Sequence, residues 1–191
     1  METTMTPMRT STLHFTSRRQ CGFTLLEVLI SIVVITIGLI SMLGAFGVAM
    51  AATQTARQDM VAKQLAQEAM ESIVTARETA DATWDQINNV GTTGIFVAGP
   101  QPINKAGVDG IVGTADDAAA LPETMQEPGP DGIVGTADDP APTPLTNYQR
   151  TIAITPTATG DLRNVTITIQ YSAPRSATRT YVLAGMISQY R

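Results

Sequence analysis

The chain has 191 residues, of which 43% are hydrophobic and only 5% aromatic, so any globular core is small. Its net charge is −5, and no basic patch of the kind that binds nucleic acid is evident. The charge is unevenly distributed, because three arginines and one acid precede Gly22 whereas nine basic and sixteen acidic residues follow it. This order predicts a single membrane pass with the N-terminus in the cytoplasm and the acidic part outside.

The first 22 residues are rich in Thr, Ser and Met and follow neither a helical nor a strand period. We interpret residues 1–22 as a leader peptide that is removed. The only cysteine, Cys21, and the only histidine, His14, both lie in this segment. The remaining chain therefore has neither an internal disulfide nor a catalytic site based on His or Cys, and we do not expect an enzyme.

Residues 23–52 form an apolar stretch, and residues 28–56 contain no charge. Such a stretch exceeds the roughly 20 residues that cross a bilayer as a helix. One carboxylate, Glu27, lies near its start. An ionised carboxylate in hydrocarbon costs roughly 2.5–3.5 kcal/mol on insertion scales, so Glu27 needs a compensating partner.

Residues 53–80 continue as an amphipathic helix, with no proline or turn signal between the two stretches. We therefore predict one helix over about residues 24–80, of which only the second half covers a soluble domain. The apolar positions of that half step by four: Val61, Leu65, Ala69 and Ile73.

Residues 81–147 are predicted to be a loop region, because eight of the eleven prolines fall between residues 98 and 147. Trp84, the only tryptophan, is expected to anchor a small core. The region contains an internal repeat at residues 107–119 and 129–141, in which the nine letters DGIVGTADD recur identically at a spacing of 22. Two copies are too few for a solenoid, which needs about three.

The repeats are acidic, and from residue 106 to residue 149 there are eight acids and no Lys or Arg. Clustered carboxylates on a glycine-bent loop suit Ca²⁺, which takes 6–8 oxygen ligands, although the spacing is neither that of an EF-hand nor that of a calcium β-roll. The alternative is a duplicated, solvated loop without metal, and the sequence leaves both interpretations open. The candidate calcium ligands are Asp109, Asp116, Asp117, Asp131, Asp138 and Asp139.

Residues 148–191 are predicted to form antiparallel strands. The segments NYQRTIAITP, DLRNVTITIQYS and TRTYVLAGMIS alternate apolar and polar residues, and turn signals separate them. One face of this sheet needs a cover, and the amphipathic half of the long helix is the candidate. The predicted fold is therefore α+β, with one long N-terminal helix packed on a small antiparallel sheet of about three to four strands and a loop insert rich in Pro, Gly and Asp.

The stretch GFTLLEVLIS, which begins at Gly22, lies between a short basic leader and a long apolar helix. Here the sequence resembles the prepilin family, which comprises type IV pilins and the pseudopilins of type II secretion. The resemblance covers about residues 18–75. The remainder is similar only in layout, with a helix followed by an antiparallel sheet.

The resemblance implies that a prepilin peptidase cleaves between Gly22 and Phe23 and methylates the new amino group of Phe23. It further implies a subunit that lies in the inner membrane, contacts an assembly platform and other pilin or pseudopilin subunits, and then enters a filament. Glu27 is four residues beyond the new amine and is expected to share a helical face with it. The pair would give the carboxylate its counter-ion, from its own or a neighbouring subunit.

The segments IGLISMLG and KQLAQEAMESI most resemble minor pilins of the type IV pilus-modification class. A type II secretion pseudopilin is the alternative. A third reading, a soluble secreted calcium-binding protein, relies on a faint twin-arginine signal and a cleavage site that would leave Ala52 as the first residue. That reading conflicts with the length of the apolar stretch and with the position of Glu27.

Overall fold

A computed structural model describes residues 22–91, 93–172 and 178–190. The predicted leader, including His14 and Cys21, lies outside the described residues except for Gly22. By contacts the chain divides into two compact units, Met1–Gly47 and Val48–Arg191. Each unit is described below by itself.

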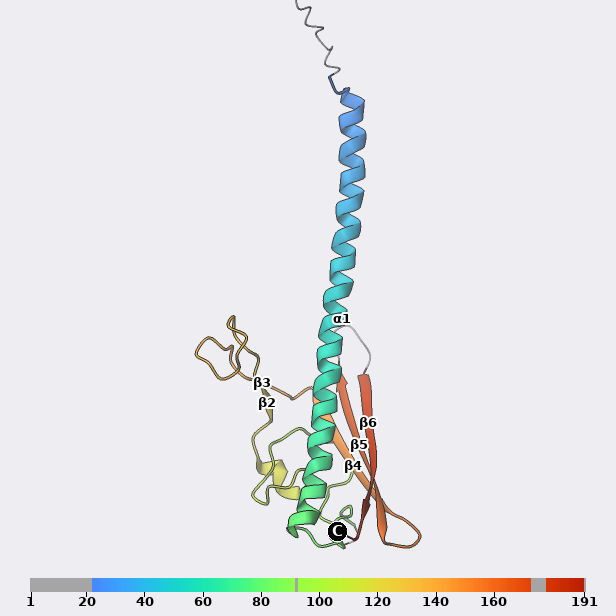
Figure 1. Ribbon diagram of the computed structural model, residues 1–191, viewed down its shortest axis with the longest axis vertical. Coiled ribbons are helices and arrows are strands. Elements are labelled where there is room, and N and C mark those ends of the chain that lie inside the picture. Colours follow the sequence, from blue (N-terminus) through green and yellow to red (C-terminus); the bar gives the residue numbers. More distant parts are fainter. Residues whose placement is uncertain (1–21, 92, 173–177, 191) are drawn as a thin grey trace, which may run out of the picture. The chain divides into compact units, whose positions relative to one another are not determined.

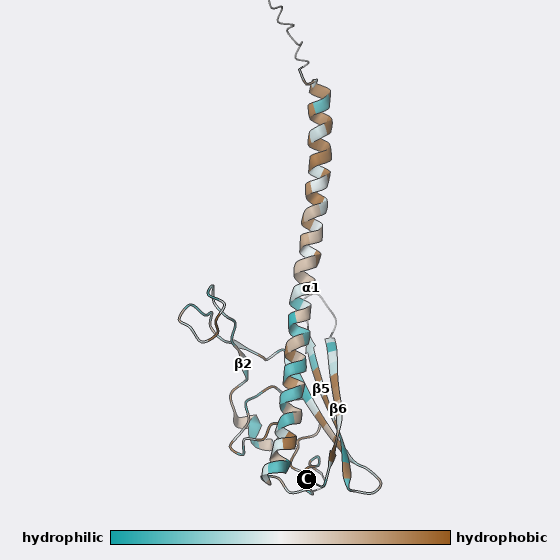
Figure 2. Ribbon diagram, in the orientation of Figure 1, coloured by the Kyte–Doolittle hydropathy of each residue, from teal (hydrophilic) through white to brown (hydrophobic). Residues whose placement is uncertain are grey.

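The first unit contains the apolar part of the long helix α1 (Leu25–Thr79). Every residue from 22 to 54 is exposed, and hydrophobic side chains dominate this part of the helix (Figure 2). Within the described residues α1 is the one helix long and apolar enough to cross a membrane. Its few hydroxyls are satisfied locally, since Ser31, Thr36 and Ser41 donate to the carbonyls four residues earlier at 2.7–2.9 Å. Such bonds suit a helix that lies in lipid.

The second unit contains the C-terminal half of α1, which buries one stripe of side chains. The stripe steps by three or four residues, as the sequence predicts for an amphipathic helix. Small alanines make up much of the stripe, which lets the helix axis approach the sheet closely. Its members are Val61, Ala62, Leu65, Ala66, Ala69, Ile73 and Ala76.

The sheet beneath α1 has four antiparallel strands in the order β1-β4-β5-β6 (Figure 1). The long strands are β4 (Tyr148–Pro156), β5 (Leu162–Ser172) and β6 (Thr178–Ser188), and β1 (Gln101–Pro102) adds a short edge. A second sheet pairs β2 (Thr124–Met125) with β3 (Thr143–Pro144), and a 3-10 turn, η1, spans Ala115–Ala119. The predicted α+β fold is confirmed. The predicted loop region contains these short elements, which have no apolar period to reveal them.

The register places one residue in every two on the face that α1 covers. Ile152 pairs with Ile167, which pairs with Leu183, and this row lies at the centre of the core. Gly185 lies on the same face of β6, where a Cβ atom would come within 3.1 Å of the Met70 Cε. A larger residue there would require the end of the Met70 side chain to move.

The tryptophan lies at the rim of the core rather than at its centre. Trp84 is partly buried, and its indole N–H donates to the Gly160 carbonyl at 3.1 Å. The guanidinium of Arg163 lies over the indole ring at 4.6 Å from its centroid, in cation–π geometry. Trp84 thus ties the segment after α1 to the turn between β4 and β5.

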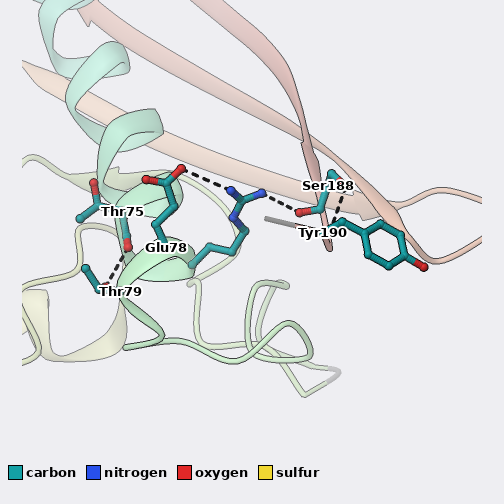
Figure 3. A network of polar contacts seen from close by, with 6 residues as sticks. Thr75, Glu78, Thr79, Ser188 and Tyr190 are labelled. Carbon is teal, nitrogen blue, oxygen red and sulfur yellow. Dashed lines mark hydrogen bonds and ion pairs between the residues drawn. The ribbon is translucent and has the colours of Figure 1, made fainter.

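Arg77 connects the end of α1 to the end of β6, where its partners Glu78 and Ser188 are labelled in Figure 3. Its Nη1 donates to the Ser188 carbonyl at 2.7 Å, and its Nη2 lies 3.3 Å from a Glu78 carboxylate oxygen. Arg77 also lies in the last turn of the helix, where a cation stabilises the helix dipole. This contact connects residues 111 positions apart in the chain.

Candidate functional site

The N-terminal motif begins the helix. Gly22 and Phe23 precede the first helical residue, Leu25, and Phe23 is 82% exposed. The Glu27 N–H donates to the Thr24 hydroxyl at 3.2 Å, so Thr24 acts as an N-cap. The spacing of Thr24 and Glu27 is that of a capping box, and an acid in the first turn favours the helix dipole.

One detail of the sequence interpretation needs correction. Phe23 was expected to share a helical face with Glu27, but the helix begins at Leu25 and Phe23 lies outside it. The reason is the cap, because the Thr24 side chain satisfies the Glu27 N–H and ends the helix there. The spacing of four residues therefore does not by itself bring an amine at Phe23 onto the carboxylate.

The first acidic repeat is a compact turn held by its own aspartates. Asp117 accepts backbone hydrogen bonds from Gly107 at 2.8 Å and Gly113 at 2.6 Å. Asp116 accepts from the Asp109 N–H at 3.1 Å and from a threonine hydroxyl, and Asp109 accepts from the Ile111 N–H at 2.8 Å. All three predicted ligands thus stabilise the loop directly.

The second repeat reproduces this network. Asp139 accepts from Gly129 at 2.8 Å and from Gly135 at 2.5 Å, as Asp117 does in the first repeat. Asp138 accepts from the Asp131 N–H at 3.2 Å and from a threonine hydroxyl at 2.6 Å. Both repeats also use glycines at positive φ at matching positions, with φ of 71° and 96° in the first and 74° and 94° in the second. The nine identical residues therefore form equivalent turns and aspartate hydrogen bonds twice, although only the first copy continues into a 3-10 helix, η1.

The environments of the two repeats differ. In the first, Ile111 and Val112 are 5% and 4% exposed, and the Val112 N–H donates to the Ser72 hydroxyl of α1 at 2.9 Å. In the second, the equivalent Ile133 and Val134 are 61% and 56% exposed. The interpretation of the repeats as a solvated loop is therefore wrong for residues 111–114 of the first copy, which are buried, whereas residues 108–110 are exposed.

The same difference changes the acidity of equivalent aspartates. Burial raises the pKa of the Asp117 carboxyl, against the hydrogen bonds from Gly113 and Gly107 and the nearby positive charge of Arg150. The hydrogen bond from Gly135 leads the causes that lower the pKa of Asp139, which is only partly buried. The deeper burial of Asp117 and the hydrogen bonds of Asp139 thus shift the pKa values of two equivalent groups in opposite directions.

The calcium ligands predicted from sequence are brought together in one repeat only. Ligand oxygens of Asp131, Asp138 and Asp139 lie within 4.8 Å of one another, and among the described residues no such group forms at the first repeat. The donor set, three carboxylates in a small loop, is of the hard type that Ca²⁺ prefers. Each of these carboxylates already accepts hydrogen bonds from its own loop. Calcium binding stays a prediction, limited to the second repeat.

The N-terminal segment also carries a family signal. Residues 17–43 match the prokaryotic N-terminal methylation motif. The chain carries a type IV prepilin-like signal. The resemblance stated from GFTLLEVLIS is thereby confirmed, and comparisons with curated proteins and with solved structures gave no match.

The protein is therefore pilin-like or pseudopilin-like. The motif implies that this prepilin-like chain is a substrate of prepilin peptidase and assembles with other pilin subunits. Its long apolar helix fits a membrane-anchored subunit.

The second unit of this prepilin-like protein, Val48–Arg191, is called the head below. It contains a buried charge that the sequence analysis did not identify. Arg150 is 3% exposed on the core face of β4, between Tyr148 and Ile152, and its Nη1 has no hydrogen-bond partner among the described residues. Burial lowers its pKa, while the charges of Glu68, Asp117 and Glu123 act in the opposite direction. The strand period could have revealed this position, because Arg150 falls in the apolar phase.

Arg150 thus lies among carboxylates from three parts of the fold. Burial raises the pKa of both Glu68, on α1, and Glu123, just before β2, and Arg150 opposes the shift in each case. The third carboxylate is Asp117 of the first repeat. The cluster therefore connects the helix, the sheet and the first repeat electrostatically.

Proposed function

We propose that this chain is a minor subunit of a type IV pilus. Prepilin peptidase cleaves it between Gly22 and Phe23 and methylates the Phe23 amine, and the apolar half of α1 then packs into the filament. The single observation that carries the proposal is the match of residues 17–43 to the methylation motif, which includes the start of α1, where every residue up to 54 is exposed. Exposed apolar side chains all around this part of the helix need either lipid or neighbouring helices.

Glu27 is the residue that we propose for assembly. A carboxylate in an apolar environment is strongly unfavourable alone and tolerated when paired. Because Phe23 lies outside the helix and Thr24 caps it, the counter-ion that we propose is the Phe23 amine of a neighbouring subunit. Glu27 then favours subunits that are in axial register and disfavours the isolated subunit in lipid.

The processing step is tested by the mature N-terminus. N-terminal sequencing or intact mass of the membrane-extracted chain should give N-methylated Phe23 as the first residue. A first residue at Ala52 would instead support the soluble secreted protein, and an intact leader would refute processing.

The assembly step is tested by substitution of Glu27. Glu27→Ala and Glu27→Gln should leave cleavage intact and reduce the amount of the subunit in sheared filaments, whereas Glu27→Asp should retain part of it. Glu71→Ala is the matched control, because Glu71 is an exposed acid on the distal half of the same helix. Unchanged incorporation of Glu27→Ala would exclude the pairing.

A type II secretion pseudopilin is the second candidate, since the motif is common to both machines. Subunits that co-purify with the processed chain separate the two: other pilus subunits support the first proposal, and secretion components support the second. Under either proposal the chain lies in the inner membrane with its N-terminus in the cytoplasm before assembly, and it acts without catalysis.

A further inference from the structure

The second repeat presents two apolar side chains, Ile133 and Val134, here named its tip, that no residue in the described part of the chain buries. Ile133 and Val134 are 61% and 56% exposed, although their counterparts Ile111 and Val112 are almost fully buried. The two repeats share sequence, glycine conformations and equivalent hydrogen bonds to their aspartates, so Ile133 and Val134 lie on a loop that its own aspartates hold, like the loop that packs on α1. A preformed apolar tip of this kind loses little conformational entropy when it binds.

The tip is surrounded by uncompensated negative charge. Asp131, Asp138 and Asp139 form no ion pair with any residue that the structure describes. The segment from residue 106 to residue 149 contains no Lys or Arg that could neutralise them locally. A surface that covers this tip must therefore combine apolar area with positive charge.

The head carries such a surface between α1 and β6, here named the α1–β6 groove. Met60, which is 63% exposed, and the aromatic Tyr181 both line it. Asp59 is already engaged, because it pairs with Arg179 at 3.3 Å and accepts the hydroxyl of Tyr171. Lys63, which also lines the groove, forms no ion pair with the described residues, so the groove has an excess of positive charge.

We propose that the second repeat of one subunit docks in the α1–β6 groove of a second copy of this chain. Ile133 and Val134 then cover Met60 and Tyr181, and the aspartates of the repeat lie beside Lys63 and Arg179. The two surfaces differ, and the repeat projects on one side of α1 while β6 lies on the other (Figure 1). A contact between two different surfaces is heterologous, so it does not form a two-fold symmetric dimer and can repeat head to tail between copies that are neighbours in the filament.

The inference builds on the proposed filament function, and disulfide cross-linking of the full chain tests it. Cys21 is the only cysteine and lies in the leader, so the processed chain has no background thiol. A chain with Ile133→Cys and Met60→Cys, expressed in cells that assemble filaments and then oxidised, should give a ladder at multiples of the subunit mass. A bond forms only where the two Cα atoms approach to about 4.4–6.8 Å.

Three controls define the result. Each single substitution should give no ladder. Val108→Cys with Met60→Cys should also give none, because Val108 is fully exposed in the first repeat but lies outside the proposed contact. Adding Lys63→Glu to the cross-linking pair should lower the yield of cross-linked product roughly two- to five-fold, because an exposed ion pair contributes that much to an equilibrium.

Other outcomes overturn the inference. A dimer from Ile133→Cys alone indicates a symmetric contact, and a product of different mass indicates another protein as the occupant. A link from Ile133→Cys to Ser72→Cys in place of Met60→Cys indicates exchange of the repeats on α1. Processing and filament content are measured in the same samples: a processed, incorporated chain without the ladder refutes the docking alone, whereas an unprocessed chain absent from filaments refutes the proposed function too.

Discussion

The first and second acidic repeats have the same nine residues and equivalent hydrogen bonds to their aspartates, but the first packs Ile111 and Val112 into the core, whereas Ile133 and Val134 of the second are exposed to solvent. In the first, Ile111 and Val112 contribute buried apolar surface, and Asp117 carries a raised pKa. In the second, the equivalent side chains face solvent, and the pKa of Asp139 is lowered. The local sequence therefore specifies the conformation of the loop, and the residues around the loop determine how much each of its side chains contributes to stability.

The largest contrast should come from the isoleucines. Ile111→Ala removes a buried side chain and should lower the free energy of unfolding by about 2–5 kcal/mol. Ile133→Ala, at an exposed position, should change it by about 0.5 kcal/mol or less. Urea unfolding of the full chain in detergent, followed by the fluorescence of the single tryptophan, measures both. Equal effects would show that the second repeat is also packed.

The glycines at positive φ give the next contrast. Gly113→Ala and Gly135→Ala both introduce a left-handed alanine, which costs about 1–2 kcal/mol. At Gly113 the new Cβ atom also overlaps the buried Ile152 side chain, whereas at Gly135 no atom lies within 4 Å. Overpacking should add about 1–3 kcal/mol to the loss at Gly113. The same unfolding experiment measures both variants. Equal losses in the free energy of unfolding would contradict the conclusion that Gly113 is packed in the core and Gly135 is not.

A smaller contrast is expected for the loop aspartates. Asp117→Ala leaves the amides of Gly107 and Gly113 without their acceptor in a buried site, which should cost about 1–3 kcal/mol. Asp139→Ala exposes the equivalent amides to water, so the loss should be clearly smaller. Thermal unfolding of the two variants side by side gives the difference. A larger loss of stability for Asp139→Ala than for Asp117→Ala would contradict the conclusion that the first repeat is the buried one.

The smallest expected effect is the difference between the pH values at which Asp117 and Asp139 titrate. Carbon-13 NMR of the carboxyl groups should give a higher titration midpoint for Asp117 than for Asp139. A raised pKa means that the contribution of Asp117 to stability is full below its unfolded pKa and is lost as the pH rises through the folded pKa. Asp139 behaves oppositely, because its contribution is present above its unfolded pKa and is lost as the pH falls through the folded pKa. Coincident midpoints would contradict the difference in burial.

Much of the fold could be predicted because its signals are periodic. The four-residue step of Val61, Leu65, Ala69 and Ile73 predicted the buried stripe of α1, and alternation predicted the three long strands. The short strands β1, β2 and β3 could not be predicted, because two residues cannot show a period. Buried Arg150 was missed because arginine was read as polar, although its position in the strand period is that of a core residue.

The candidate sites were predicted to different extents. Gly22, Phe23 and Glu27 belong to a motif of neighbouring residues, which can be recognised in the sequence without the fold, and the family match covers them. The role of Thr24 as the cap was missed, although its spacing from Glu27 is the sequence signature of a capping box. The six aspartates were identified from the sequence as one set. Three of them belong to the repeat that packs on α1 and three to the exposed repeat, and this difference depends on contacts with α1.

By itself the sequence determined the apolar helix, the processing motif and the local shape of both repeats, because these depend on residues close together in the chain. Only the tertiary structure decided which repeat is buried. Identical nonapeptides have identical local conformational preferences, so burial depends on the residues that surround each copy. The Ser72 hydroxyl of α1 accepts a hydrogen bond from Val112 of the first repeat, and no described contact of that kind holds Val134 of the second. The same chemistry thus stabilises the head in one place and leaves a surface for another subunit in the other.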